Sequence, residues 1–172
     1  MQLLTNAEKI RTVRDLSHNI KDTKINPIIS DAQIEDLRPL LGDEFFYMIV
    51  TDPTSYSDLI GETKYFTKDG KESFSFGLER VVSEFAYARY KFDSTDISTP
   101  NGLVQKQNEN ATNTTRDRAK ELYTAQSKIA VQYWLSVERY LINNRDLYPE
   151  FRNDRRKVNN VKTTYLRRNP WL

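Results

Sequence analysis

The stretch from Thr115 to Asn144, TRDRAKELYTAQSKIAVQYWLSVERYLINN, predicts the longest element of the chain. It contains neither proline nor glycine, and Pro149 follows soon after its end. At steps of three and four residues it places side chains that fit one helical face: Ala119, Leu122, Gln126, Ile129, Tyr133, Val137, Tyr140 and Leu141. We therefore predict one long helix late in the chain, roughly 45 Å in length.

Four further helices are predicted upstream of this one, and three of them are clear from their caps and their apolar faces. Residues 77–92 form a helix with Leu78, Val81, Val82, Phe85 and Ala86 on its inner face, and residues 7–13 form a short one capped by Thr5 or Asn6. Asn26-Pro27 is expected to open the next helix, because asparagine caps well and proline suits the first helical position. Pro39 should kink that helix and Gly42 should end it.

The region between Gly42 and Gly77 predicts an aromatic helix and a hairpin. Asp43 is expected to cap a helix that carries Phe45 and Phe46, and Thr51-Asp52-Pro53 should stop it. Residues 64–67 and 72–76 alternate polar and aromatic side chains around Asp69-Gly70, which is typical of a β-hairpin. Two strands alone are marginally stable, so this hairpin should lean on the helices or on another subunit.

Residues 93–115 predict a long loop between the last two helices. The segment is polar and rich in turn residues, and its only apolar island is Leu103-Val104. A loop of this length inside a compact domain is usually functional or disordered. The predicted fold class is therefore mainly α: a small helical bundle with one long C-terminal helix, a short β-hairpin and a long inter-helix loop. We assign residues 1–151 to the helical domain and residues 152–172 to a C-terminal tail.

The charge of the chain is uneven. The net charge of the 172 residues is +2, but residues 152–172 hold seven basic side chains and one acidic one. The tail therefore carries +6 and the body −4. Three interpretations stay open: a solvated terminus, a segment that docks onto an acidic partner protein, or a segment that contacts DNA phosphates.

No constellation in the sequence favours an enzyme, a metal or a cofactor. The chain has no cysteine and one histidine, His18, which cannot build the usual zinc site. Its five glycines are scattered singly, so no phosphate-binding loop is present. The acidic pairs that an acid–base reaction would need suit a polar helix face or a helix start better: Asp31, Glu35, Asp36, Asp43 and Glu44.

Targeting signals are also missing from the sequence. No run approaches 18 apolar residues, so we expect no membrane partner. Residues 1–6 lack the basic start and apolar block of a signal peptide. Synthesis in the cytoplasm of the cell is the simplest expectation.

The order of several short segments resembles a known family, the head–tail connector (adaptor) proteins of bacteriophages. The similarity is greatest to the branch found in Bacteroidetes phages, including the crAss-like phages. The segments that carry it span residues 26–47, 101–106 and 130–151: Asn26-Pro27-Ile28-Ile29, Leu37-Arg38-Pro39-Leu40-Leu41-Gly42, Phe46-Tyr47, Asn101-Gly102-Leu103-Val104-Gln105-Lys106, Tyr133-Trp134, Asn143-Asn144 and Leu147-Tyr148-Pro149. The tail after Arg152 is longer than this resemblance leads us to expect.

The resemblance implies a structural virion protein located in the neck of the particle. Such a subunit forms a ring of about a dozen copies below the portal protein, joins head to tail, extends the DNA channel and supports the next ring or tail protein. Its partners would be itself, the portal, that next protein and, as an open question, the passing DNA.

Three regions are expected to carry these contacts, and the first is the hairpin at 64–76. The loop at about 93–115 would act as a subunit-interface arm through Gly102, Leu103, Val104 and Lys106. The tail would meet the portal, another partner or DNA through Arg155, Arg156, Lys157, Arg167, Arg168 and Trp171. The alternative function is a nucleic-acid-binding module that uses the same basic tail.

Overall fold

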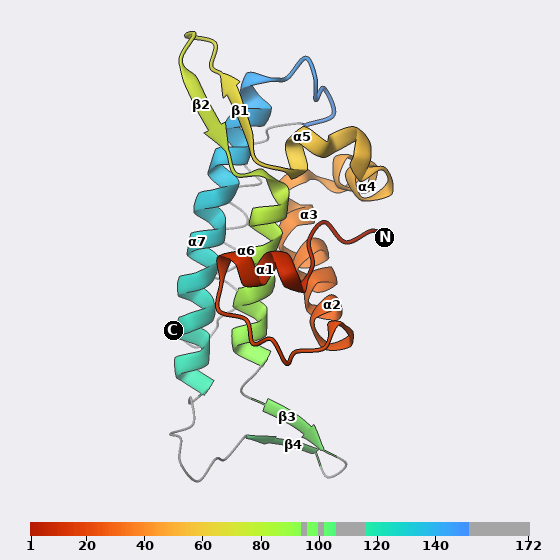
Figure 1. The fold of residues 1–172 in the computed structure, drawn as a ribbon, viewed down its shortest axis with the longest axis vertical. Helices are drawn as coiled ribbons and strands as arrows, with labels where there is room; N and C mark the ends of the chain where they lie inside the picture. Colours follow the sequence, from red (N-terminus) through yellow and green to blue (C-terminus); the bar gives the residue numbers. More distant parts are fainter. Residues whose placement is uncertain (94–95, 100–101, 106–115, 152–172) are drawn as a thin grey trace.

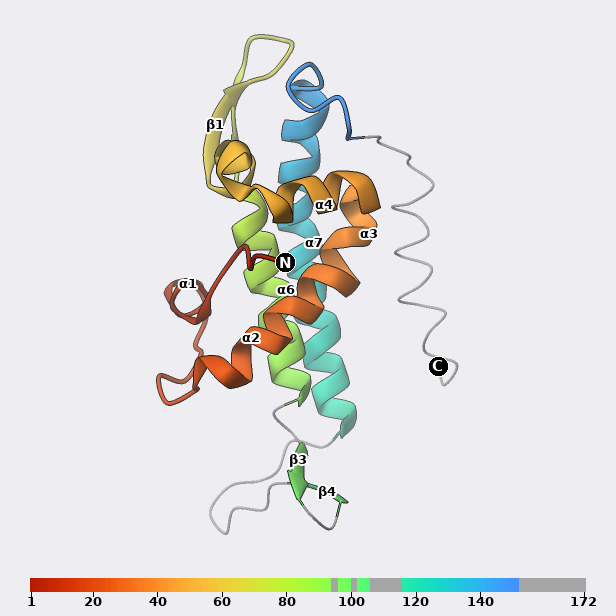
Figure 2. The same ribbon diagram turned by 90° about the vertical axis from the view of Figure 1, so that its right-hand side faces the viewer.

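The computed structural model describes residues 1–93, 96–99, 102–105 and 116–151, and two long helices form its axis. Helix α6 (Gly77–Asp93) and helix α7 (Arg116–Asn143) lie side by side along the long axis of the molecule (Figures 1 and 2). Both agree with the predicted helices to within one residue at each end. The predicted class, a mainly helical protein with a small antiparallel hairpin and a long C-terminal helix, is confirmed.

Helix α6 is the centre of the bundle rather than one of its faces. Every side chain from Val81 to Ala88 is buried, including Ser83 and Glu84. The one-sided inner face predicted for this helix was therefore incomplete, because α1, α2 and a π-helical segment cover its other sides. Trp134 of α7 is 1% exposed and Phe85 is equally buried, so both aromatic residues belong to the core.

The N-terminal helices begin differently from the prediction. Helix α1 (Ala7–Val13) is capped by the Asn6 side chain, as expected, but α2 (Asp22–Asp31) begins four residues before Asn26. Pro27 therefore lies inside a helix, which the prediction of a helix start at Asn26-Pro27 got wrong. Burial of Ile25 and Ile29, one turn apart on the same face, offsets the hydrogen bond that Pro27 cannot donate.

Pro39 is accommodated by a local widening of the helix. The π-helical segment η1 (Ala32–Leu37) runs from α2 into α3 (Arg38–Leu41), and the Arg38 amide donates to the Gln33 carbonyl five residues back. A proline at position 39 cannot donate and its ring crowds the preceding turn, so a wider turn relieves the conflict. Gly42, with φ of 87°, then ends the helix as predicted.

The segment after Gly42 packs across the end of the bundle. Helix α4 (Asp43–Thr51) begins directly at Asp43, so Gly42 is the N-cap and the predicted capping role of Asp43 was wrong by one position. A 3-10 turn, η2 (Pro53–Tyr56), and the short helix α5 (Ser57–Ile60) follow. Phe45 of α4 contacts Tyr148 and Phe151, each with ring centroids 6.2 Å apart, so the chain after α7 folds back onto this layer.

The predicted hairpin is present and leads into α6. Strands β1 (Thr63–Phe66) and β2 (Glu72–Ser75) pair antiparallel, with Lys64 opposite Phe74 and Phe66 opposite Glu72. Gly77 has φ of 73° at the first residue of α6, and a Cβ there would lie 2.2 Å from the Gly61 carbonyl oxygen. The hairpin and α6 therefore meet at a position where only glycine fits.

A second hairpin replaces part of the predicted long loop. Strands β3 (Asp96–Thr99) and β4 (Gly102–Gln105) pair antiparallel, with Ile97 opposite Val104. The prediction treated this region as loop because polar side chains dominate it. In Figures 1 and 2 these strands extend beyond the end of the α6–α7 pair, away from the first hairpin.

Candidate functional site

The β1–β2 hairpin presents an exposed aromatic surface. On one side of the hairpin Tyr65 is buried, whereas Phe66 on the other side is 72% exposed. Phe74 shares the outward side diagonally across the ladder, and Phe76 continues it; both are 38% exposed. We call these three phenylalanines, with Lys64, the hairpin face. Clusters of exposed large aromatic side chains mark sites of protein association more often than scattered single ones do.

The hairpin is held against α7 along its whole length. The Tyr65 and Tyr140 rings meet edge to face with centroids 5.2 Å apart. The Phe76 amide donates to Ser136 Oγ (3.3 Å), and the Lys68 amide donates to Asn143 Oδ1 (3.2 Å) near the turn. The hairpin therefore leans on the helices, and the hairpin face is presented by a fixed backbone.

Aromatic contacts extend the hairpin face onto α7. The Phe74 and Phe76 ring centroids are 5.0 Å apart, and Phe76 meets Tyr133 at 4.8 Å, both edge to face. The guanidinium carbon of Arg80 lies 4.6 Å from the centroid of the Tyr133 ring. The aromatic surface thus ends at Arg80, a cation on α6. It combines an apolar centre with a charged rim, as protein interfaces commonly do.

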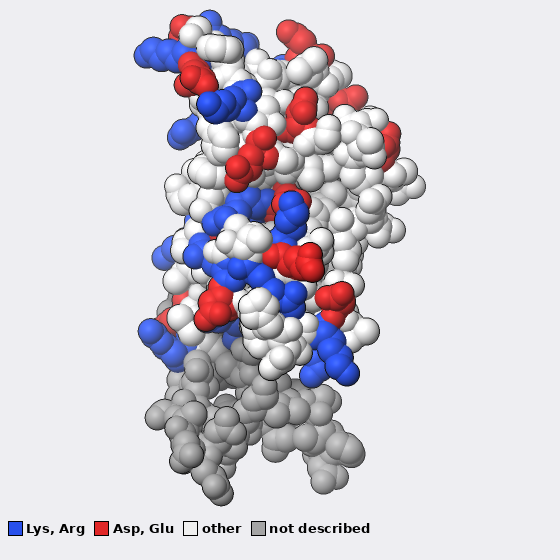
Figure 3. Space-filling model, viewed as in Figure 1, with Lys and Arg blue, Asp and Glu red and all other residues white. Residues whose placement is uncertain are grey.

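The opposite side of the same end of the molecule is acidic. Between Arg38 and Lys64 the sequence contains no lysine or arginine, but it contains five exposed acidic residues: Asp43, Glu44, Asp52, Asp58 and Glu62. Tyr47 of α4 lies among them in sequence and is 69% exposed. We call these six residues the acidic face. Figure 3 shows acidic side chains over the α4–α5 side, and basic side chains interspersed with acidic ones over the hairpin.

Local contacts fix the negative charge of this region. The Ser55 hydroxyl and amide donate to the Asp52 carboxylate, and these hydrogen bonds lower the pKa of that carboxyl. The Asp43 carboxylate has one cationic neighbour, Arg38, at 3.8 Å. Among the described residues, the acidic face therefore has little neutralising positive charge nearby.

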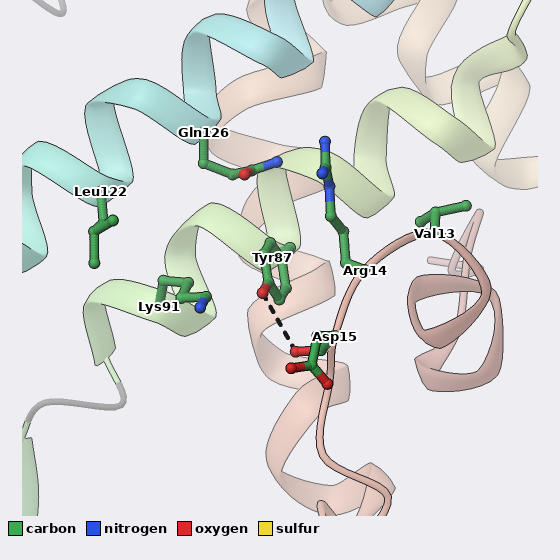
Figure 4. Close-up of a pocket in the computed structure, with 7 residues that line it drawn as sticks. All are labelled: Val13, Arg14, Asp15, Tyr87, Lys91, Leu122 and Gln126. Carbon is green, nitrogen blue, oxygen red and sulfur yellow. Dashed lines mark hydrogen bonds between the residues drawn. The ribbon is translucent and has the colours of Figure 1, made fainter. Parts of the chain in front are cut away.

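A shallow pocket lies between the end of α1, α6 and α7. Its volume is about 340 Å³, and Figure 4 shows the residues that line it: Val13, Arg14, Asp15, Tyr87, Lys91, Leu122 and Gln126. The Tyr87 hydroxyl donates to the Asp15 carbonyl (3.3 Å), which ties the turn after α1 to α6. Lys91 lies over the Tyr87 ring, 5.2 Å from its centroid.

The charges behind this pocket neutralise one another. Glu84 is fully buried; its carboxylate accepts from Arg14 Nε at 2.7 Å and from the Gln126 amide, and Arg80 Nη2 lies 2.9 Å away. The hydrogen bond with Glu84 is the main cause that raises the pKa of Arg14. A carboxylate held by two arginines is a structural network rather than a proton donor or acceptor.

The acidic residues of the first candidate acid–base group lie in different surroundings. Asp36 is buried and accepts from Arg89 Nε at 2.6 Å, whereas Asp31 and Glu35 are exposed on the same helical stretch. His18 is exposed in the turn between α1 and α2. Within the described residues no cluster of three or more histidine, cysteine or acidic side chains has the arrangement of a metal site.

Among the described helices, none combines the length and the apolar character that a membrane crossing requires.

The predicted site residues are only partly within the described structure. Gly102, Leu103 and Val104 lie on β4, where Gly102 pairs with Thr99. Lys106 and the tail residues lie outside the described residues: Arg155, Arg156, Lys157, Arg167, Arg168 and Trp171. Sequence reasoning named residues 64–76 as a contact surface, but it missed the acidic face, whose signal was a run of 25 positions without a basic residue.

Comparison with known proteins gives one match. No curated protein and no solved structure is significantly similar to the chain. Residues 37–160, from the π-helical segment through α7 and beyond, match the model of a protein family described as a family of unknown function, DUF6712. Because that match covers more than half of the sequence, the chain belongs to the DUF6712 family.

Proposed function

We propose that this chain is a structural ring subunit of a bacteriophage neck, a head–tail connector that stacks below the portal protein. The observation that carries the proposal is the hairpin face, an exposed aromatic surface on a hairpin that α7 holds in place. Phe66 is 72% exposed, so its ring does not stabilise an isolated monomer. The same ring stabilises an oligomer if a neighbouring subunit buries it.

The proposal assigns roles to regions rather than to catalytic residues. About a dozen copies would surround the DNA channel, and the portal and the next tail protein would contact the two ends of the ring. The order of the sequence segments that resemble phage connectors supports this assignment. The pairing of the buried charged groups also supports it, because paired charges of this kind serve the structure rather than catalysis. The protein would act in the virion, without a cofactor and without enzymatic activity.

Light scattering on a sizing column, over a wide range of protein concentrations, tests the proposal. We expect a species many times the monomer mass that grows with concentration or appears when the cognate portal protein is added. A protein that stays monomeric at every concentration, with and without the portal, would contradict the proposal.

The alternative is a nucleic-acid-binding module, which the +6 charge of residues 152–172 favours. It predicts tight binding of duplex DNA by the free subunit, with affinity that falls steeply as salt rises. A channel ring does not need to grip DNA, so weak binding at physiological salt separates the two functions in favour of the connector.

A further inference from the structure

Among the described residues, nothing covers two different surfaces at one end of the molecule. The hairpin face offers Phe66, Phe74 and Phe76 to solvent, and the hairpin carries three exposed lysines: Lys64, Lys68 and Lys71. The acidic face offers five carboxylates and Tyr47. One surface is aromatic and rich in lysine, and the other is acidic with one large exposed ring.

The hairpin face and the α4 part of the acidic face lie apart, whereas Asp58 and Glu62 adjoin the base of the hairpin. In Figure 1 the hairpin lies beside α7, whereas α4 lies beyond α6 on the other side of the helix pair, and the turned view in Figure 2 also separates them. Both occupy the same end of the long axis, opposite to the β3–β4 hairpin. A contact between unlike surfaces on two copies is heterologous, and such contacts build a ring when the rotation from copy to copy closes.

Charge favours this pairing over a symmetric one. Two hairpins brought together would oppose two segments that each carry three lysines and two carboxylates, a net charge of +1, and two acidic faces would oppose carboxylates to carboxylates. The hairpin contains three lysines and two acidic residues, Asp69 and Glu72. The Nζ atom of Lys64 lies 3.3 Å from the Glu72 carboxylate. Lys68 and Lys71 near the turn therefore remain the cations best placed to meet a partner's carboxylates.

We infer that the hairpin face of one copy docks onto the acidic face of the next copy, so that this head-to-tail contact builds the ring. The inference rests on the proposed ring function and names the two surfaces that form it. Phenylalanine side chains of the hairpin supply the apolar centre, Tyr47 of the next copy packs against them, and lysines pair with carboxylates at the rim.

Two single-face variants test the contact in the full-length protein. One carries Phe66→Ser and Lys68→Glu on the hairpin, and the other carries Glu44→Lys and Tyr47→Ser on α4. All four side chains are exposed, so both variants should keep the circular dichroism and melting temperature of the natural protein. Lys24→Glu on α2, an exposed lysine outside both faces, serves as the control for the change of charge.

We expect each single-face variant to need at least about tenfold more protein for half-assembly, because each loses an exposed aromatic anchor and a charge pair. The control should assemble as the natural protein does. An equimolar mixture of the two variants should give a discrete pair of one copy each, because the intact hairpin of one meets the intact α4 of the other. That mixed pair cannot extend, since its two outer surfaces are both altered.

The outcomes separate this contact from the ring itself. If the natural protein assembles and either variant assembles equally well, the inferred contact is wrong and the ring proposal stands. A mixture that yields only monomers also overturns the contact. If the mixed pair disappears when residues 152–172 are removed, the basic tail occupies the acidic face in place of the hairpin. A natural protein that never assembles would overturn the ring and the contact together.

Discussion

At the scale of single residues, Glu84 shows how a central helix tolerates a charge. It is fully buried in α6, yet Arg14 from the end of α1 and Arg80 from one turn earlier both reach its carboxylate. The two arginines are themselves largely buried, with 26% and 19% of their side chains exposed. The network therefore locks α1 to α6, and the removal of its one anion would leave two arginines without the carboxylate that neutralises them.

Glu84→Gln is expected to lower the free energy of unfolding by about 3 kcal/mol, the amount typical of breaking a buried ion pair. Urea titration followed by circular dichroism measures this change. Glu79→Gln is the matched control, because its pair with Lys9 (3.2 Å) lies at the surface and should cost less than about 1 kcal/mol. Equal losses in the two variants would show that the Glu84 network does not support the fold.

Tyr148 predicts a dependence of stability on alkaline pH. Burial, reinforced by the hydrogen bond with the Tyr140 hydroxyl (3.2 Å), raises the pKa of Tyr148. Because the pKa is higher in the folded chain, the unfolded chain loses this proton first as pH rises past about 10. The stability that the neutral phenol contributes is complete below that pH and is lost above it.

Tyr148→Phe should therefore cost about 1 kcal/mol near pH 8, the value of one hydrogen bond, and that difference should shrink as pH rises beyond about 10. Urea titrations at a series of pH values measure it. Tyr47→Phe, at an exposed position, is the control for the removal of a tyrosine hydroxyl. A difference between wild type and Tyr148→Phe that is constant with pH would contradict the assignment.

At the scale of elements, the sequence predicted most helices and the first hairpin, since periodicity and turn residues determine them locally. The failures have identifiable causes. Pro27 and Asn26 resemble a helix start, but burial of Ile25 and Ile29 outweighed that local preference. The full burial of α6 could not be predicted, because it depends on which helices cover it. The β3–β4 hairpin lacks the apolar alternation on which strand prediction relies.

The junction between the hairpin and α6 gives a sharp prediction at this scale. In Gly77→Ala the new Cβ would lie 2.2 Å from the Gly61 carbonyl oxygen and 2.3 Å from that of Ile60, and backbone atoms cannot move aside easily. We expect a loss above about 4 kcal/mol, measured by thermal or urea unfolding.

Gly70→Ala is the matched control for this junction. Gly70 has a similar positive φ of 75°, but no atom lies within 4 Å of the added Cβ. Only the backbone penalty of about 1 kcal/mol remains. Equal stability of the two alanine variants would contradict the close approach of Gly77 to the backbone of Ile60 and Gly61.

At the scale of the whole molecule, the sequence was enough to name residues 64–76 as a contact surface. It was not enough to predict which side of the hairpin faces outward. That depends on the contact of Tyr65 with Tyr140, which only the fold reveals. The acidic face likewise comes from α4 and α5 folding onto one end of the bundle. Functional residues on surfaces are set by the arrangement of elements, so local patterns identify them only in part.

Deletion of the predicted arm tests whether it is a subunit contact. Deleting residues 98–110 should leave a folded helical monomer that fails to assemble, because strands β3 and β4 extend beyond the α6–α7 pair. Circular dichroism tests whether the variant folds, and light scattering tests whether it assembles. If the deletion unfolds the protein, the arm belongs to the core; if assembly is unchanged, the arm is not a subunit contact.

The most direct test of the central claim is electron microscopy of the largest species that the purified protein forms, alone or with its portal protein. The ring proposal predicts closed particles with a central hole, rotational symmetry and about a dozen subunits. Images that show only compact monomers or two-fold dimers without a hole, under both conditions, would contradict it.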